Sequence, residues 1–227
     1  MPFCCSCAAG IREYFTLGTI RQITRQLLEC LGAMHGAGLV HCDVKPDNVC
    51  FASVSERTVR LIDFGSSLGA YDLKSSYTQA RWYRAPEVML GVEWDSKIDM
   101  WSLGCLLCEL RLGQPIFHGS SVAEVLAAQQ AVLGLHPLSL LTAADPNLRS
   151  MYFFGDQLYA VDPSNQREGC YVVRPQPMSL AALLGTEDAE FLDFVKGLLE
   201  YTSSSRMSAT DALEHPWMAS QGEAATH

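Results

Sequence analysis

The first strongly patterned stretch of the chain begins at Thr19. Hydrophobic residues recur there at steps of three and four, at Ile20, Ile23, Leu27, Leu28, Leu31 and Met34. This spacing puts them on one face of an α-helix, and the following Gly36 and Gly38 are typical helix-ending residues. The pattern therefore predicts an amphipathic helix that leads into the stretch Leu39–Asn48.

Two patterns of another kind follow this helix. Val49–Phe51 and Val59–Ile62 are short β-prone runs on either side of the polar stretch Ser53–Thr58, which predicts a small hairpin. Further on, Ile98–Leu110 is apolar nearly all round and is followed by Gly113, which predicts a helix inside the core. Because a buried carboxylate is costly without a partner, Asp99 in that helix must have one.

The last third of the chain alternates between helical and irregular patterns. Ser121 and Glu124 have capping-box spacing and open a helix predicted to run through Leu133, with Gly134 as its C-cap. The proline-bearing stretch Leu135–Thr186 is expected to be irregular.

Two more helices are predicted at the end of the chain. The first has its apolar face at Phe191, Phe194, Val195, Leu198 and Leu199. The second is short, capped by Ser208 and Asp211, and precedes Pro216. The predicted fold class is mainly α with a short β-hairpin, an α+β arrangement.

Composition narrows the class of protein. The chain has 227 residues, 48% of them hydrophobic, which favours one domain with a substantial core. Its net charge of -9 argues against nucleic acid or an anionic membrane as a partner. The longest apolar runs, around Leu103–Leu110, are shorter than the roughly 20 residues of a membrane span.

The nine cysteines show no regular framework of spacings, and no charged-then-apolar leader precedes them, so we expect a reduced, intracellular protein. The cluster of Cys4, Cys5 and Cys7 lacks a second ligand pair at zinc spacing and a myristoylation glycine, which disfavours a metal or lipid role. Cys105 and Cys108 form a C-x-x-C on an apolar helix and are expected to be core residues rather than a redox pair.

The candidate chemistry is concentrated in His41-Cys-Asp-Val-Lys-Pro-Asp-Asn48, which combines a carboxylate, an ammonium and an amide in one short loop. Alone, such a loop could be no more than a solvated turn. It is followed in order by Asp63-Phe-Gly65, by Ala85-Pro-Glu87 and by Asp99-Met-Trp-Ser-Leu-Gly104. This ordered series resembles the C-terminal lobe of eukaryotic protein kinases.

The resemblance implies specific roles for the polar residues. Asp43 would accept the proton of the substrate hydroxyl, and Lys45 would bind and neutralise the transferred phosphoryl group. Asn48 and Asp63 would hold Mg²⁺ that bridges the phosphates of ATP. Cys50 would lie under the adenine, although a core cysteine is an equal alternative.

Other residues of these motifs are implied to be structural. His41 is expected to pack under Phe64, next to Gly65, rather than to carry a proton. Asp99 is expected to accept hydrogen bonds from the backbone of the loop that contains Asp43. Glu87 is expected to pair with Arg206 near the end of the chain.

Three features indicate which kinases the chain resembles. The pattern Asp-x-Lys-Pro-x-Asn around Lys45 is that of serine/threonine kinases. Arg84 before Ala-Pro-Glu and the long insert at 135–186 together resemble the CMGC group. Arg84 and this resemblance also imply a preference for proline after the phosphorylated residue. His41-Cys-Asp43 resembles the dual-specificity tyrosine-regulated kinases, the DYRK family.

The stretch Tyr77–Arg84 also resembles the DYRK activation segment. Tyr77 would be the second tyrosine of the family's Y-x-Y, although Ser75 stands in place of the first. By this resemblance Tyr77 is phosphorylated in cis, and Arg81 and Arg84 hold the phosphate. An ordinary exposed tyrosine remains the alternative.

The resemblance covers about residues 18–218, with 1–17 expected to be a loosely ordered segment and 219–227 a tail. The Gly-rich loop, the strand Lys and the helix Glu of a complete kinase do not occur in this sequence. We therefore expect a C-lobe without its N-lobe, an incomplete copy of a kinase acting on proteins with ATP and Mg²⁺. A partner would then cover the apolar surface that faces the N-lobe. The alternative is a non-catalytic scaffold or docking protein.

Overall fold

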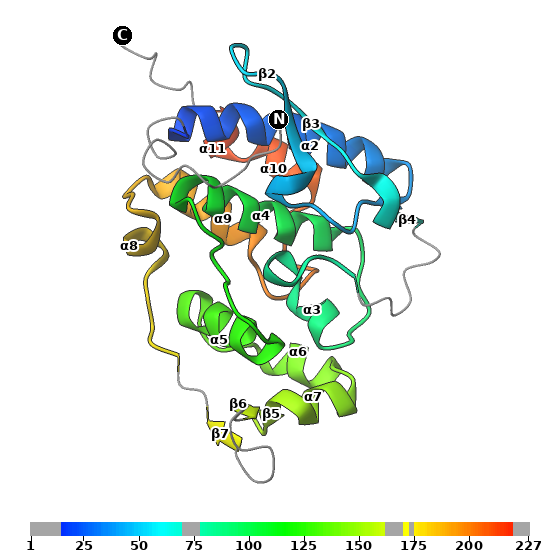
Figure 1. Ribbon diagram of the computed structural model, residues 1–227, viewed down its shortest axis with the longest axis vertical. Helices are drawn as coiled ribbons and strands as arrows, with labels where there is room; N and C mark the ends of the chain where they lie inside the picture. The colour runs from blue at the N-terminus through cyan, green and yellow to red at the C-terminus, as the bar shows by residue number, and fades with distance from the viewer. Residues whose placement is uncertain (1–14, 70–77, 162–169, 173–174, 220–227) are drawn as a thin grey trace.

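Helix α4 (Lys97–Leu112) lies in the middle of the molecule in the computed structural model, which describes residues 15–69, 78–161, 170–172 and 175–219 (Figure 1). Every residue from Ile98 to Leu110 is buried, as expected for a helix that is apolar nearly all round. Gly113 ends the helix in the left-handed conformation, at φ 77°. The predicted core helix is confirmed.

Two amphipathic helices pack against α4, namely α2 (Leu17–Gly36) and α9 (Ala189–Leu198). Each turns the apolar face predicted from its sequence into the core. The Thr16 side chain accepts a hydrogen bond from Thr19 N at the start of α2, and Asp188 caps α9 in the same way.

The short helices α10 (Ala209–Glu214) and α11 (Pro216–Ala219) pack against α2 near the end of the chain. Ser208 and Asp211 form the predicted capping box at the start of α10. Trp217 of α11 is fully buried and packs its ring against Phe191 and Phe194 of α9, with ring centroids 5.0 and 4.7 Å apart.

Strands β2 (Val49–Ser53) and β3 (Thr58–Leu61) form the predicted antiparallel hairpin, which projects from the end of the molecule opposite the β5–β7 sheet (Figure 1). Strands β1 (Leu39–Val40) and β4 (Leu68–Gly69) also pair, which the sequence did not indicate. Together the two pairs bring both ends of the loop 41–48 close to residues 62–68.

The stretch 135–186 was predicted to be irregular, and for much of its length that prediction was wrong. It contains α6 (Leu138–Ala143), α7 (Pro146–Tyr152), α8 (Leu180–Leu184) and a sheet of β5 (Phe153–Phe154), β6 (Gln157–Val161) and β7 (Cys170–Val172). Pro137 and Pro146 stand at the starts of α6 and α7, where a proline has no hydrogen bond to lose.

Helix α5 (Val122–Leu133) precedes this region and was predicted with its caps, Ser121 and Gly134. Its capping differs from the expected box in one respect. Ser121 Oγ accepts from Glu124 N, but the Glu124 carboxylate accepts from Ser120 N and Oγ in place of the Ser121 backbone N–H. These bonds from Ser120 lower the pKa of Glu124 below its usual value.

Four short helical turns lie in the chemical motifs themselves: η1 (Pro46–Asn48), η2 (Phe64–Ser66), η3 (Arg81–Tyr83) and α3 (Pro86–Met89). Within the described part of the chain, none of the helices combines the length and the hydrophobicity that crossing a membrane requires. The predictions for Cys4, Cys5, Cys7, Ser75 and Tyr77, and for most of the two terminal segments, fall outside the described residues.

Candidate active site

Two side chains of the loop between β1 and β2 converge on the carboxylate of a third, Asp43. Lys45 Nζ lies 2.7 Å from Asp43 Oδ2, and Asn48 Nδ2 donates to the same oxygen at 2.8 Å. Asn48 Nδ2 also donates to the Asp43 carbonyl at 2.7 Å, and turn η1 holds Asn48 in this position. The predicted residues thus form a compact group of a carboxylate, an ammonium and an amide.

The backbone beneath this group is fixed by Asp99 of α4, which is completely buried. Its Oδ2 accepts from His41 N at 2.8 Å, and its Oδ1 accepts from Cys42 N at 2.9 Å. These are the contacts predicted for Asp99. The sequence did not indicate the third one, from His35 Nε2 of α2, at 2.9 Å from Asp99 Oδ2.

Cys42 lies between these contacts in a left-handed backbone conformation, with φ 67°. A non-glycine residue adopts this conformation at an energetic cost, so the surrounding bonds must hold it there. Burial raises the pKa of the Cys42 thiol to about 12, and the negative charge of Asp99 contributes to the increase. The thiol therefore stays protonated and does not act as a nucleophile.

His41 connects the loop to the residues after β3. Its Nδ1 accepts from Asp43 N at 3.3 Å, so its Nε2 carries the proton and donates to the Ile62 carbonyl at 3.2 Å. The ring meets the edge of Phe64 with centroids 5.2 Å apart. Both ring nitrogens are thus occupied, in agreement with the structural role expected for His41.

Asp63 follows β3 with a left-handed backbone, at φ 63°, and is exposed. Its Oδ1 accepts from Gly65 N at 3.3 Å, which leaves its other carboxylate oxygen available. Asn48 uses its amide nitrogen on Asp43, so its amide oxygen is available too. A carboxylate and an amide oxygen are ligands that suit Mg²⁺, which commonly completes its coordination with waters and substrate phosphates.

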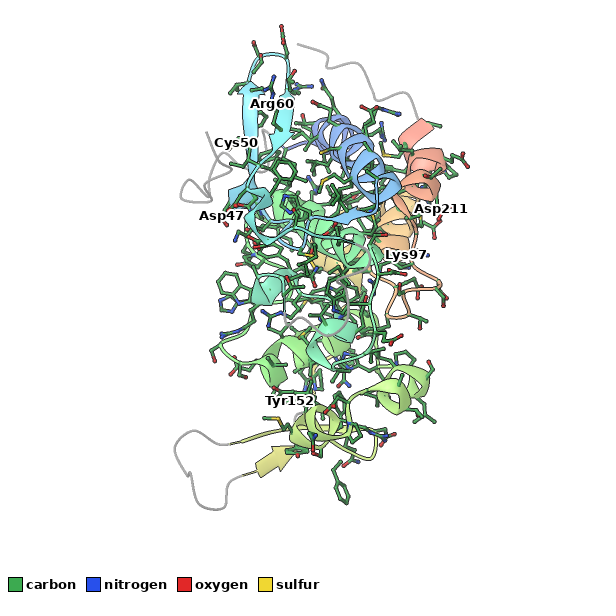
Figure 2. All side chains as sticks on the ribbon, turned by 90° about the vertical axis from the view of Figure 1, so that its right-hand side faces the viewer. Asp47, Cys50, Arg60, Lys97, Tyr152 and Asp211 are labelled. Carbon is green, nitrogen blue, oxygen red and sulfur yellow. The ribbon has the colours of Figure 1, made fainter. Side chains whose placement is uncertain are left out.

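The residues present therefore fit a Mg²⁺ ion shared with a nucleotide. Among the described residues there is no cluster of three His, Cys, Asp or Glu side chains that could hold a metal without such help. Cys50 is half-buried on β2, and it lies with Asp47 along one edge of the molecule, below the tip of the hairpin (Figure 2).

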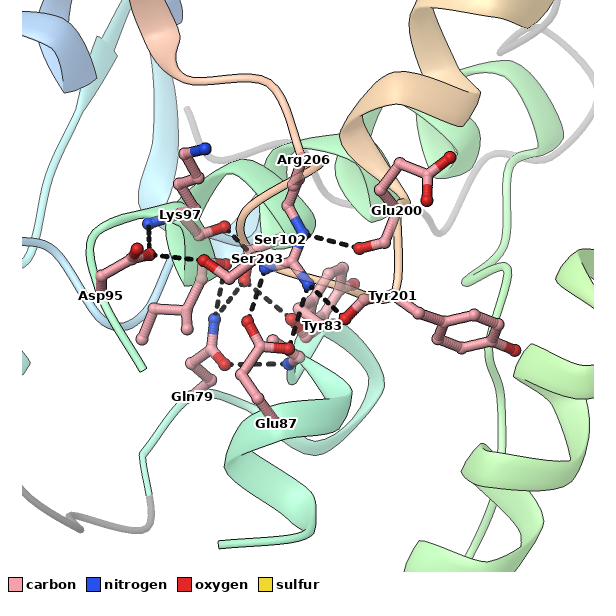
Figure 3. Close-up of polar contacts among 12 residues, drawn as sticks. Gln79, Tyr83, Glu87, Asp95, Lys97, Ser102, Glu200, Tyr201, Ser203 and Arg206 are labelled. Carbon is pink, nitrogen blue, oxygen red and sulfur yellow. Dashed lines mark hydrogen bonds and ion pairs between the residues drawn. The ribbon is translucent and has the colours of Figure 1, made fainter. Parts of the chain in front are cut away.

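On the other side of Asp43, residues 78–87 run along α4. Gln79 is buried in this segment and was not singled out from the sequence. Its Nε2 donates to Ile98 O at 2.9 Å and to Ser102 Oγ at 2.7 Å, and its Oε1 accepts from Ala85 N at 2.9 Å (Figure 3). One sequence signal was available, since Ser102 is a polar residue three positions after Asp99 in a mostly apolar helix.

The arginines predicted to hold a phosphate are placed differently from one another. Arg84 is buried, and its Nε and Nη2 donate to the carbonyls of Thr78 and Gln79 at 2.7 and 2.6 Å. Arg81 is exposed and donates to the Ser120 carbonyl. Thr78 Oγ1 donates to Cys42 O at 3.4 Å, which ties this segment to the loop that contains Asp43.

Glu87 and Arg206 form the predicted ion pair, with two hydrogen bonds of 2.6 and 3.0 Å between buried side chains (Figure 3). Arg206 also donates to the carbonyls of Lys97, Glu200 and Tyr201. All the guanidinium donors are thereby used, which is the condition under which a buried ion pair is tolerated. The pair holds the segment 78–87 against the C-terminal part of the chain.

Comparisons with known proteins agree with this arrangement. The family model described as protein kinase domain matches residues 8–218. The chain is 37% identical over 204 residues to human dual specificity tyrosine-phosphorylation-regulated kinase 4, covering 90% of the chain and 38% of that protein. It is 36% identical over 219 residues to the putative dual specificity tyrosine-phosphorylation-regulated kinase 3 homolog of Drosophila melanogaster, covering 90% of the chain and 26% of that protein.

A fission yeast protein is similar as well. Serine/threonine-protein kinase ppk5 of Schizosaccharomyces pombe is 33% identical over 201 residues, which cover 88% of the chain and 23% of that protein. The chain thus spans between 23% and 38% of the length of these three relatives.

Proposed function

Since this chain belongs to the protein kinase family and, within it, to the DYRK family of the CMGC group, we propose that it supplies the catalytic loop and the substrate side of a kinase that phosphorylates serine and threonine in proteins. The observation that carries the proposal is the convergence of Lys45 and Asn48 on Asp43, at 2.7 and 2.8 Å. Phosphoryl transfer depends mainly on positioning and charge neutralisation, and this group offers both.

Each residue then has one task. Asp43 orients the substrate hydroxyl and accepts its proton, and Lys45 places a positive charge beside the oxygens of the transferred group. Asn48 and Asp63 hold Mg²⁺, and Cys50 contacts the base of the nucleotide. When bound, ATP with Mg²⁺ supplies the phosphoryl group and neutralises part of its charge.

A preference for proline after the phosphorylated residue is part of the same proposal. Thr78 Oγ1 bonds to Cys42 O next to Asp43, and we expect the residue after the substrate hydroxyl to lie near the backbone of the following Gln79. The Gln79 carbonyl already accepts from Arg84 Nη2 at 2.6 Å, which leaves it a poorer acceptor for a peptide N–H. Proline has no N–H and loses nothing there.

We further propose that Tyr77 is phosphorylated in cis and that Arg81 and Arg84 bind the phosphate. The support is that Arg84 already holds the two residues that follow Tyr77, and that Arg81 is exposed close to them in sequence. Charge-assisted bonds from two guanidinium groups would then order the segment.

The side of the molecule that carries Asp63 also exposes apolar side chains. Leu39, Ile62 and Phe64 are 45%, 38% and 52% exposed. Because the relatives are longer than this chain, we propose that a further part of a longer protein, or a partner, covers these residues.

One assay tests the catalytic proposal and the tyrosine together. The chain and its Asp43→Asn variant are incubated with ATP, Mg²⁺ and a generic basic protein, followed by peptide mapping of both proteins. We expect transfer by the wild type and a loss of at least about 100-fold in Asp43→Asn, because the isosteric amide cannot accept a proton. Phosphate on Tyr77 is expected in the wild type alone.

Chelation of Mg²⁺ should abolish transfer, and thermal unfolding of the two proteins should show that the variant is folded. Equal background signals from folded wild type and variant would reject catalysis by this chain and favour the alternative, a docking protein without activity. Transfer to substrate without phosphate on Tyr77 would reject only the cis modification.

A further inference from the structure

Helix α5 ends beside a groove, and none of the residues assigned to phosphoryl transfer lines it. The groove has a volume of about 510 Å³, and its walls are residues 130–135 together with Pro175, Pro177, Met178 and Ser179. This volume is typical of sites that enclose a small molecule or a large side chain. We propose that the groove is a docking site for a tryptophan side chain in an extended segment of a partner protein.

The two walls of the groove are fastened to each other and to the rest of the fold. The segment before α8 passes alongside α5, and Met178 N donates to Ala131 O at 2.8 Å (Figure 1). Tyr201 OH donates to Gly134 O at 2.9 Å, which ties the end of α5 to the residues after α9. A groove held in this way is formed before a ligand arrives, so little ordering is needed on binding.

The groove is uncharged and opens onto exposed apolar side chains. No charged residue is among those that line it. Leu135 and Met178 at its edge are 72% and 49% exposed, and Leu138 at the start of α6 is exposed as well. Exposed apolar side chains gathered in one place mark an interaction surface. An ion would lose its hydration there without gaining a partner, so the occupant is neutral and mostly apolar.

Three acceptors along this wall are available to an occupant. Val132 O and Leu133 O are among the last carbonyls of α5, and neither has a hydrogen-bond partner among the described residues. Gln130 is only 7% exposed and donates through Nε2 to His136 Nδ1, whereas its Oε1 has no partner in the described part of the chain. That oxygen is not sealed from solvent, so a ligand in the groove can reach it. The occupant therefore brings hydrogen-bond donors.

Tryptophan meets these conditions better than the other amino acids. Its ring system is large and uncharged, and its indole N–H is a donor without an acceptor. Phenylalanine has no donor, and the tyrosine hydroxyl adds lone pairs that three acceptors leave unpaired. Tryptophan is also one of the residues that contribute most to binding at protein interfaces.

A protein suits the groove better than a free small molecule. The carbonyls of Val132 and Leu133 can accept from the backbone N–H groups of an extended peptide. A small molecule inside the groove would leave Leu135 and Leu138 in water, whereas a protein surface around the tryptophan covers them.

Two matched probes test the need for a donor. Indole and 1-benzothiophene have nearly the same fused-ring shape, but only indole has an N–H. Methyl NMR of the whole chain, followed at Met178 and Leu135, gives the dissociation constants of both probes for the wild type and for Gln130→Met. We expect the ratio of the two constants to shift against indole by about fivefold in the variant, the effect of one hydrogen bond. Comparing ratios cancels the different hydrophobicity of the probes.

Gln130 also donates to His136, so Gln130→Met is used only if its methyl spectrum is that of a folded protein. Otherwise 1-methylindole replaces the variant, because it keeps the ring and lacks the N–H. It should then bind the wild type about fivefold more weakly than indole.

Peptide selection tests whether the side chain comes from a protein. Random peptides displayed on phage are selected on the wild type, and the enriched peptides are titrated against Leu135→Ser and Val54→Ser. Both substitutions change an exposed apolar residue, but Val54 lies at the tip of the β2–β3 hairpin. We expect tryptophan at one position of the enriched peptides, binding about tenfold weaker to Leu135→Ser, and unchanged binding to Val54→Ser.

Each outcome decides the proposal. If neither indole nor the peptides bind, the groove is not a docking site. An unchanged probe ratio, or 1-methylindole as tight as indole, contradicts the role of Gln130 Oε1 and of the donor. Indole binding without tryptophan in the selected peptides, or peptides that ignore Leu135→Ser, would make the groove a small-molecule site and overturn docking. None of these results depends on phosphoryl transfer, so the catalytic proposal and this one can fail separately.

Discussion

His136 is a buried residue whose ionisation bears on the stability of the whole fold. Its Nδ1 accepts from Gln130 Nε2 at 3.0 Å, so its Nε2 carries the proton that Gln129 Oε1 accepts at 3.1 Å. The rings of Tyr201 and Phe153 pack against it. Burial lowers the pKa of His136 to about 3, so the imidazole is neutral at pH 7.

This pKa predicts how stability depends on pH. Between pH 6.5 and about pH 3, His136 binds a proton in the unfolded chain but not in the folded one. The free energy of unfolding should therefore fall as the pH is lowered through this window, by on the order of 4 kcal/mol from His136 alone. Urea unfolding of wild type and His136→Met at several pH values measures it.

The variant should lose less stability than the wild type between pH 6.5 and pH 4, although it starts from a lower value because Gln129 and Gln130 lose their partner. Other groups titrate in this range in both proteins, so the difference between the two curves is the relevant quantity. Parallel curves would show that His136 is protonated without cost in the folded protein.

Buried polar residues differ in how far their contacts can be predicted from the sequence. The contacts of Asp99, and the pairing of Glu87 with Arg206, were predictable because a family resemblance and the cost of a buried carboxylate both pointed to them. Gln79 and His136 carry no such signal, since glutamine and histidine are common on surfaces. Their burial is set by segments far away in the sequence, which periodicity does not describe.

At the scale of elements, Gly104 of α4 marks a close approach between two helices. A Cβ added there would lie 2.9 Å from Leu199 Cδ2, closer than real Cβ contacts, and 3.0 Å from Leu198 Cβ, which is tighter than most. Leu198 is the last residue of α9, which packs against α4, and Leu199 is its C-cap. Gly104 therefore determines how near α9 can lie to the core helix.

Gly104→Ala should destabilise the protein by about 1 to 3 kcal/mol, because α4 and α9 must move apart or repack. Gly36→Ala is the matched control, since a Cβ at the end of α2 meets nothing within 4 Å. It should be neutral or stabilise by about 0.5 to 1 kcal/mol through the unfolded chain. The urea unfolding midpoints of both variants are compared with that of the wild type. Equal destabilisation by the two would contradict the close contact between Gly104 and the two leucines.

Helices and strands could be predicted where the local sequence alone determines them. Helices α2, α4, α5, α9 and α10 and the β2–β3 hairpin came from periodicity and caps alone. In contrast, α6 and α7 are short and begin at prolines, which in a sequence are typical of breaks between helices. The β1–β4 pair joins residues 39–40 to 68–69, and no local pattern announces such a pairing.

At the scale of the molecule, α4 is the element to which both sides of the candidate site are bonded. Asp99 holds the loop with Asp43, Ile98 and Ser102 hold Gln79, and α2 and α9 enclose the helix. The β2–β3 hairpin is far less buried than α4, because its tip from Val54 to Arg57 is exposed. The free energy of the opening that exposes backbone amides to solvent should therefore be much higher for α4 than for the hairpin tip.

Native-state hydrogen exchange tests this difference. Amides in 100–110 should exchange only when the whole protein unfolds, whereas those in 53–58 should exchange by local opening. With a global stability of about 5 kcal/mol or more, protection in α4 should exceed that in the hairpin tip by at least about 1,000-fold. Comparable protection would mean that α4 opens locally, and a helix that opens locally could not keep Asp43 and Gln79 at a fixed separation.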